Sequence, residues 1–213
     1  MRRAGPLQGA SRGIVLLHGR GGSAADILSL MDHAGLPDVT AIAHEAPGAT
    51  WWPSSFLAPH ALIEPYVHRG VTAVTKSIAA LQAEGIPRTA IWLGGFSQGA
   101  CLALESFART GDGLAGVLAF SGGLVGTSDT GGPEEDALYG HAPKRFDYPG
   151  RRDGARVWLS VHARDPHIPP KRAQDSIAAL DLQGAAVTGM VYPGAGHSVM
   201  HQDLAQMRLW LGG

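Results

Sequence analysis

The sequence predicts an α/β fold, with a mostly parallel central sheet and helices on both of its faces. Short runs of β-branched and aliphatic residues, stopped by glycine or proline, alternate with longer segments whose apolar residues recur at helical spacing. Strands that alternate with helices build a parallel sheet, because each helix returns the chain across one face of the sheet. We find no internal repeat in the sequence.

Two groups of segments carry this prediction. The strand candidates are compact apolar runs, and they lie at residues 13–19, 39–47, 90–95, 114–123, 155–163 and 185–193. The helix candidates have apolar residues at helical spacing or a position directly after a strand, and they lie at residues 59–85, 98–110, 170–182 and 199–211. Residues 1–12 are predicted to be an N-terminal extension. Residues 127–154 are rich in Gly, Pro and charge, and we expect either a mobile insertion or a lid there.

Length and composition limit the possible classes of protein. The 213 residues fit one domain, residues 1–213, without a large cap domain, and 45% hydrophobic residues can supply its core. A formal net charge of −1 gives no reason to expect nucleic acid or an anionic membrane as a partner. No apolar run is long enough for a membrane span or a signal peptide. The single cysteine, Cys101, excludes an internal disulfide framework. We therefore expect a cytoplasmic protein.

One motif points to chemistry at the end of the third predicted strand. The stretch reads IWLGGFSQGACLAL, in which Gly95 to Gly99 fit the pattern G-x-S-x-G. This pattern is typical of a sharp strand-to-helix turn that projects the serine hydroxyl above the sheet, where glycines on either side avoid a collision. The following helix directs its N-terminal N–H groups toward charge that forms near Ser97. The alternative interpretation is a glycine-rich turn without chemistry. The strand before Ser97 and the helix after it favour a nucleophile.

A serine nucleophile needs a base, and His197 is the best placed of the ten histidines. It lies in VYPGAGHSVM, directly after a predicted strand and before the last helix, where the carboxyl edge of the sheet is expected. His201 is the nearby rival, but we place it one turn into that helix, facing solvent. His18 ends the first strand and is interpreted as a structural, hydrogen-bonded histidine.

The base in turn needs an orienting acid, for which Asp165 in VHARDPHIPP is the candidate because it directly follows the fifth strand. Asp153 precedes that strand, at the wrong end of the sheet, and Asp175 lies within a helix. An Asp-Pro turn without chemistry is the simpler alternative at this position. A metal site made of His162, Asp165 and His167 is a further alternative, but no supporting residues are evident and no metal is expected.

The oxyanion of a tetrahedral intermediate also needs hydrogen-bond donors. One is expected to be the backbone N–H of Gln98, directly after the nucleophile. The other is expected in the loop HGRGGSA after the first strand, where the N–H of Arg20 is best placed. Taken alone, that loop could equally be a plain glycine turn.

With these residues in place, the sequence resembles the α/β-hydrolase superfamily, and within it the small phospholipase/carboxylesterase family that includes acyl-protein thioesterase-like enzymes. The matching stretches occur in the family's order, and they are LLHGRGGSA, APGATWWPSSFLAP, GFSQGACLALE, FSGGL, RDPHIP and YPGAGHS. The resemblance implies an esterase with a Ser97–Asp165–His197 triad, an oxyanion hole at Arg20 and Gln98, and no metal or organic cofactor. It leaves the first dozen residues and the segment 127–154 unmatched.

The substrate pocket is predicted from aromatic and aliphatic residues near the carboxyl edge of the sheet. Trp51, Trp52, Phe56 and Leu57 lie in a loop after the second strand, and Ile168 follows the candidate acid. Each of them alone could equally pack its loop onto the body of the protein. Because no large cap domain fits between the strands, we expect an open site.

The leading hypothesis from the sequence is a carboxylesterase for small or medium acyl esters. A lysophospholipase or an acyl thioesterase remains an alternative. A dienelactone-type hydrolase is disfavoured, because such enzymes usually use a cysteine nucleophile and Cys101 lies inside a predicted helix. A non-catalytic ligand-binding homologue is the alternative from another class. The expected partner is a small-molecule or lipid-like ester, and a homodimer remains possible.

Overall fold

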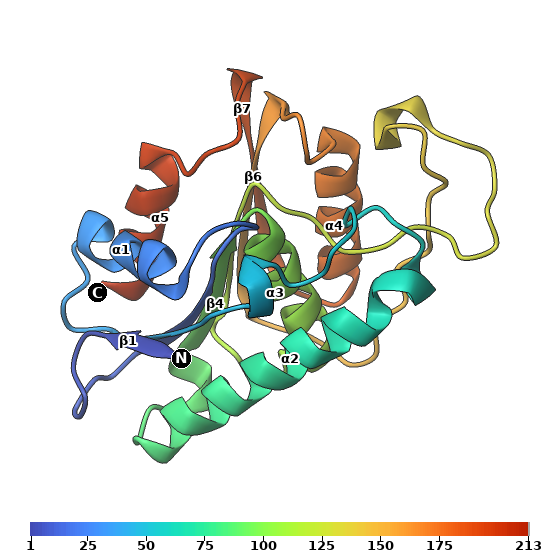
Figure 1. The fold of residues 1–213 in the computed structure, drawn as a ribbon. Coiled ribbons are helices and arrows are strands. Elements are labelled where there is room, and N and C mark those ends of the chain that lie inside the picture. The colour runs from blue at the N-terminus through green and yellow to red at the C-terminus, as the bar shows by residue number, and fades with distance from the viewer. Residues whose placement is uncertain (213) are drawn as a thin grey trace.

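A computed structural model describes residues 1–212 and shows a central sheet with helices on both faces (Figure 1). Its seven strands follow the order β1-β3-β2-β4-β5-β6-β7, in which only β1 is antiparallel to its neighbour. The strands are β1 (Arg2–Ala4), β2 (Gly13–Leu17), β3 (Thr40–His44), β4 (Ile91–Phe96), β5 (Gly116–Phe120), β6 (Arg156–Arg164) and β7 (Ala186–Ala195). The predicted α/β fold is thereby confirmed.

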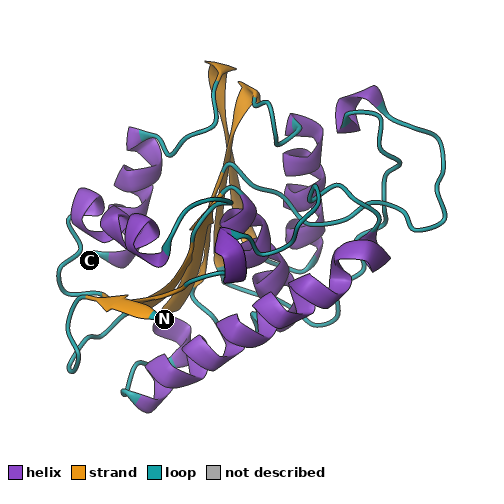
Figure 2. Ribbon diagram, in the orientation of Figure 1, coloured by secondary structure: helices purple, strands orange, loops and turns teal. Residues whose placement is uncertain are grey.

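Five α-helices cover the two faces of this sheet (Figure 2). They are α1 (Ala24–Ala34), α2 (His60–Ala83), α3 (Gln98–Thr110), α4 (Pro170–Leu182) and α5 (His201–Leu211). Helices α1 and α5 lie on one face, and α2, α3 and α4 lie on the other. Across residues 1–212, every helix is too short or too polar to cross a lipid bilayer.

The core consists of two apolar clusters, one on each face of the sheet. Along β2, Ile14 and Leu16 belong to the cluster under α1 and α5, whereas Val15 and Leu17 belong to the cluster under α2, α3 and α4. All four side chains are buried, because the central strands of a sheet with two covered faces are apolar on both sides. The carboxyl ends of these buried strands form the edge at which the candidate site residues lie.

The predicted strands and helices all appear, but two elements were missed. Strand β1 lies within the predicted N-terminal extension and pairs with β3 at the edge of the sheet, beside an ion pair between Arg3 and Glu84. Helix α1 was also missed, although the sequence carries signals for both of its ends. Ser23 and Asp26 form a capping box at its start, and Gly35 ends it at a φ of 64°.

The segment 127–154, called the insertion below, is irregular except for a short 3₁₀ turn at Asp136–Leu138. It lies beside α4 and the first turns of α2 (Figure 1). Asp129 accepts a hydrogen bond from a backbone N–H in the first turn of α2, and Tyr148 donates one to the buried Glu105 of α3. The buried Arg152 donates to backbone carbonyls at the end of α3. The insertion is therefore attached to the body of the protein at several separate points.

Candidate active site

Ser97 lies in a strained turn between β4 and α3. Its backbone has φ 54° and ψ −121°, a conformation that L-residues rarely adopt. The Ser97 N–H donates to the carbonyl of Phe120 on the neighbouring strand β5 over 2.9 Å, which ties the turn to the sheet. Strained backbone persists only where the surroundings hold it, and it is typical of functional positions.

The two glycines that flank Ser97 have steric reasons to be glycine. A Cβ atom on Gly95 would lie 2.6 Å from the backbone of Gly99, and one on Gly99 would lie 2.0 Å from the carbonyl oxygen of Leu17. Both distances are far inside van der Waals contact. The start of α3 therefore packs directly on the ends of β2 and β4, and the turn fits only with glycine at both positions.

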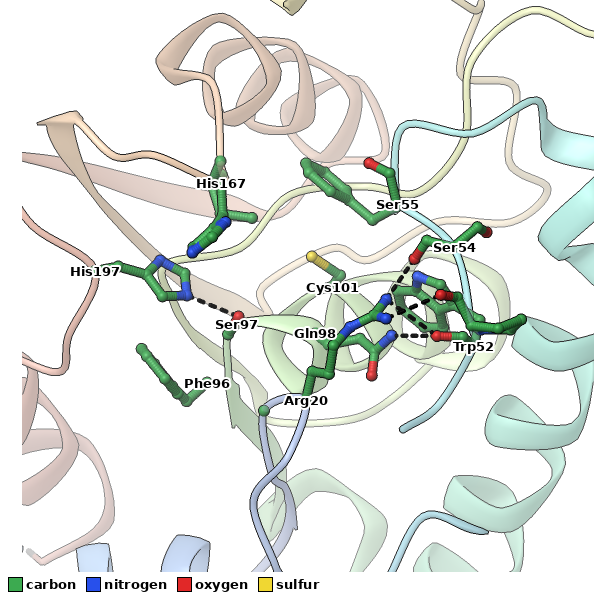
Figure 3. A pocket seen from close by; sticks show the side chains of 14 residues that line it. Arg20, Trp52, Ser54, Ser55, Phe96, Ser97, Gln98, Cys101, His167 and His197 are labelled. Carbon is green, nitrogen blue, oxygen red and sulfur yellow. Dashed lines mark hydrogen bonds between the residues drawn. The ribbon is translucent and has the colours of Figure 1, made fainter. Parts of the chain in front are cut away.

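A chain of hydrogen bonds joins Ser97, His197 and Asp165, the three residues expected to act together. His197 Nε2 lies 2.8 Å from Ser97 Oγ, and His197 Nδ1 lies 2.8 Å and 3.0 Å from the two carboxylate oxygens of Asp165 (Figure 3 shows the first of these bonds). Ser97 follows β4, Asp165 follows β6, and His197 lies between β7 and α5. Parallel strands bring the three loops to one edge of the sheet.

The surroundings of Asp165 favour its charged form. Its Oδ1 atom accepts backbone N–H bonds from His167 at 2.9 Å and Ile168 at 3.0 Å. Burial alone would raise the pKa of this carboxyl, but the hydrogen bonds from His197, His167 and Ile168 outweigh burial and hold the pKa below its usual value. A buried carboxylate with these donors can stay ionised and fix the orientation of the His197 imidazole.

Two aromatic rings pack against His197, one from Phe96, which was not expected at the site, and one from His167, which was considered only as a metal ligand. The Phe96 ring lies 5.0 Å from the His197 ring, and the His167 ring lies 4.8 Å away with its edge toward the imidazole. Figure 3 shows these side chains around Ser97. Phe96 is the variable residue before the serine of the motif, and His167 follows the candidate acid by two residues. Both positions were visible in the sequence, but neither motif specifies an aromatic contact.

Arg20 and Gln98 line the same cavity as Ser97. Their backbone N–H groups are the expected oxyanion donors. Gln98 is the first residue of α3, and the first N–H groups of a helix have no partner inside it. Among residues 1–212, the Arg20 N–H donates to no backbone carbonyl. Both groups therefore remain available to a ligand at Ser97.

The side chains of Arg20 and Gln98 both hold residues 50–54, called the tryptophan loop below. The Arg20 guanidinium donates to the carbonyls of Trp52 at 3.1 Å and Pro53 at 2.9 Å, and also to that of Ser54. The Gln98 amide accepts from the Trp51 N–H and donates to the Trp52 carbonyl, both over 2.8 Å. Figure 3 shows the two side chains converging on the loop. The residues with the expected oxyanion donors thus also fix one wall of the cavity.

Ser97 opens onto a cavity of about 500 Å³. Of the five residues predicted to form the pocket, Trp52, Phe56 and Ile168 line this cavity. The other residues that line it are Gly19, Arg20, Pro53, Ser54, Ser55, Phe96, Ser97, Gln98, Cys101, His167 and His197. Cys101 lies one helical turn after Ser97, and burial raises the pKa of its thiol to about 12, so it is not ionised at neutral pH.

Trp51 and Leu57 do not line the cavity, which corrects the expectation for these two residues. The Trp51 indole N–H donates to the carbonyl of His18 over 2.8 Å and its ring packs against the His18 ring, so Trp51 supports the loop from behind. Leu57 is buried in the apolar core. His18 has the structural role expected for it, because its Nε2 accepts the N–H of Ala46 over 3.0 Å.

The rival site residues lie apart from this arrangement. His201 is the exposed first residue of α5 rather than one turn into it. Asp153 pairs with Arg151, and Asp175 pairs with Lys171. Within residues 1–212, no three His, Cys, Asp or Glu side chains form a group that could hold a metal ion. The candidate metal ligand His162 instead packs against Gly196. A Cβ atom on Gly196 would lie 2.6 Å from the His162 ring.

Comparisons with known proteins show the family of this chain. The family model described as phospholipase/carboxylesterase matches residues 5–132, more than half of the chain. The crystal structure of a phospholipase/carboxylesterase from Dyadobacter fermentans is 34% identical, with a TM-score of 0.85 over 100% of this chain and 95% of that one.

Two further solved structures share the fold at lower identity. Esterase PE8 is 23% identical, with a TM-score of 0.73 over 100% of this chain and 99% of that one. The Bacillus cereus carboxylesterase is 16% identical, with a TM-score of 0.73 over 99% of this chain and 92% of that one. The chain therefore belongs to the phospholipase/carboxylesterase family of α/β-hydrolases, and it is a hydrolase.

Proposed function

We propose that the protein is a serine carboxylesterase in which Ser97 is the nucleophile, His197 the general base and Asp165 the orienting acid. The unbroken chain of hydrogen bonds from Ser97 Oγ through the imidazole to the Asp165 carboxylate supports this proposal most directly. In the first step Ser97 Oγ attacks the ester carbonyl while His197 Nε2 takes the hydroxyl proton. Asp165 keeps the other ring nitrogen protonated and stabilises the imidazolium that forms.

The negative charge of the tetrahedral intermediate is taken up by the backbone N–H groups of Arg20 and Gln98. The N-terminal end of α3 adds its positive partial charge at the same place. His197 then donates its proton to the leaving alcohol, and the C–O bond breaks to leave an acyl group on Ser97. Water, activated by His197, attacks this acyl-enzyme and releases the carboxylic acid.

The cavity supports esters with small or medium acyl groups as substrates. A volume of about 500 Å³ lies within the range of sites for small organic molecules. Among its lining residues, Trp52, Phe56 and Ile168 offer apolar surface that suits an acyl chain, and Ser54 and Ser55 add polar groups. No step of the reaction requires a metal ion or an organic cofactor. A chain with one buried cysteine, Cys101, needs no disulfide for its fold, which is compatible with the cytoplasmic location proposed here.

The test is kcat/KM across p-nitrophenyl esters of increasing acyl length, with Ser97→Ala as the matched variant. We expect activity to peak at short or medium chains and to fall roughly 10⁴- to 10⁶-fold in Ser97→Ala. The same panel should include an acyl thioester and a lysophospholipid. A thioester or lysophospholipid preferred by more than tenfold would replace the ester assignment by that alternative.

A covalent fluorophosphonate probe separates an enzyme from a ligand-binding homologue. We expect stoichiometric labelling of the folded protein and none of Ser97→Ala. Folded protein that neither reacts with the probe nor hydrolyses any ester of the panel would contradict the proposed function.

A further inference from the structure

One hydrogen bond joins the insertion to the acid loop, defined here as residues 165–169. The Tyr139 hydroxyl donates a hydrogen bond to the backbone carbonyl of Asp165, 26 residues away in the sequence. Among residues 1–212, no other protein group donates to this carbonyl. The contact therefore joins the insertion to the residue proposed to orient His197.

Tyr139 reaches the acid loop from an unusual backbone conformation. It follows the 3₁₀ turn at Asp136–Leu138 and has φ 56° and ψ 40°, the left-handed region that residues other than glycine rarely occupy. The preceding Leu138 is fully buried and anchors the turn, which packs against α4. A strained residue between a buried anchor and a functional loop indicates that the position of its side chain matters.

The acid loop has few hydrogen bonds of its own. Pro166 and Pro169 have no N–H to donate, and the N–H groups of His167 and Ile168 are both used by the Asp165 carboxylate. The remaining backbone donor, the Asp165 N–H, lies 3.2 Å from the carbonyl of His162. All N–H donors of the acid loop are therefore used within the loop or on the end of β6, and the Asp165 carbonyl is the group through which the insertion bonds to it.

We propose that the insertion is a brace for the acid loop and that Tyr139 is a positioning residue for Asp165. No residue of the insertion lines the cavity at Ser97, so its influence on the site passes through this contact rather than through a cover over the substrate. Removing the Tyr139 hydroxyl frees the Asp165 carbonyl, and the carboxylate and its two N–H donors then lose their fixed geometry. The expected effect on kcat rests on the proposed function, whereas the expected effect on hydrogen exchange in the acid loop does not.

Hydrogen–deuterium exchange tests the structural consequence directly. The two prolines restrict the exchangeable amides of the acid loop to Asp165, His167 and Ile168, so one peptide reports on the bonds in question. In Tyr139→Phe we expect these amides to exchange about three- to tenfold faster, the amount that the loss of one hydrogen bond allows.

Tyr148→Phe is the matched control, because it removes a hydroxyl from the same insertion but one whose partner is Glu105 of α3. We expect it to lower Tm and to leave exchange in the acid loop unchanged. Equal acceleration in both variants would mean a general loosening of the insertion and would overturn the role of Tyr139.

Steady-state kinetics on a p-nitrophenyl ester of short acyl length test the functional consequence. We expect Tyr139→Phe to lower kcat about two- to tenfold with KM unchanged, because the hydroxyl does not contact the cavity. Faster exchange with unchanged kcat would overturn the positioning role, and unchanged exchange with unchanged kcat would overturn the brace itself. If the wild-type protein has no Ser97-dependent activity, the proposed function fails, while the exchange experiment still decides whether the brace exists.

Discussion

The tryptophan loop and the insertion are both irregular segments beside the candidate active site, but they are held in different ways. The tryptophan loop spans residues 50–54, and the side chains of two cavity-lining residues, Arg20 and Gln98, hold its backbone. The insertion spans residues 127–154 and is attached at separate points, of which Tyr139 bonds the candidate acid. Two segments without regular secondary structure are therefore held to the protein in different ways.

The difference lies in what each segment is attached to. The side chains of Arg20 and Gln98 bind the backbone of the tryptophan loop. The backbone N–H groups of the same two residues are the proposed oxyanion donors. Movement of that loop therefore shifts the cavity wall and the donors together. The insertion bonds the carbonyl of Asp165, and none of its residues lines the cavity, so we expect its movement to affect the chemistry through the acid loop. We accordingly expect larger effects on activity from the tryptophan loop than from the insertion.

Among variants that distinguish the two segments, the largest effect is expected from Gln98→Ala, which removes the buried one of the two side chains that hold the tryptophan loop. The Trp51 N–H then loses its acceptor and the Trp52 carbonyl loses one donor. We expect kcat/KM for short esters to fall about 10- to 100-fold, because removal of one well-placed polar group commonly costs this much in a preorganised site. The free energy of unfolding should fall by about 1–3 kcal/mol, the cost of leaving buried polar groups unpaired.

Gln183→Ala is the matched control for this variant. Gln183 and Gln98 are both 6% exposed, and the Gln183 amide donates to the carbonyls of Ala108 in α3 and Pro149 in the insertion, neither of which lines the cavity. We expect a comparable loss of stability by chemical denaturation, with kcat/KM unchanged. Equal losses of activity in the two variants would show that Gln98 acts through general stability, and the tryptophan loop would then be no more closely coupled to the site than the insertion.

A smaller effect is expected from Arg20→Lys, which keeps the positive charge but removes the planar set of donors. One ammonium cannot reach the carbonyls of Trp52, Pro53 and Ser54 in the way a guanidinium does. We expect kcat/KM to fall about three- to tenfold and the free energy of unfolding to change by less than about 0.5 kcal/mol, because Arg20 is exposed. Activity equal to wild type would show that the Gln98 side chain alone holds the loop.

The sequence was sufficient for the parts of the site that depend on local pattern. Ser97, Asp165 and His197 each follow a predicted strand, and parallel strands place such loops at one edge of the sheet. Their proximity could therefore be predicted from strand order and motif alone. Their roles in catalysis stay a proposal until Ser97→Ala is measured.

The parts that depend on tertiary contacts could not be predicted. Trp51 and Trp52 are adjacent and chemically identical, yet only Trp52 lines the cavity, because Trp51 is bound to His18 behind the loop. The contact from Tyr139 to Asp165 spans 26 residues and depends on a left-handed turn at a residue that is not glycine. Strand β1 is similar, since its three residues carry no periodic pattern and form a strand only by pairing with β3.

The smallest effect is expected in the pH dependence of stability. It concerns Asp165, the residue that the insertion contacts. Hydrogen bonds hold the pKa of Asp165 below its usual value in the folded protein. Its charged form therefore stabilises the fold above the unfolded pKa of about 3.9, and this contribution is lost as pH falls through the lower folded pKa. We expect the difference in Tm between wild type and Asp165→Asn to be constant near neutral pH and to shrink below about pH 4.

The effect of Asp165→Asn on Tm can also be measured in the Tyr139→Phe background, which tests whether the insertion affects the ionised carboxylate. If the insertion holds the acid loop, the loss of the hydroxyl weakens the N–H bonds from His167 and Ile168 to the carboxylate, so ionised Asp165 contributes less to stability. The change in Tm that Asp165→Asn causes in this background should then be smaller at neutral pH and should vary less on acidification. In the Gln98→Ala background the change should match that in wild type, because the tryptophan loop does not contact Asp165. A change in Tm that is unaffected by Tyr139→Phe would mean that the acid loop keeps its hydrogen bonds without the insertion.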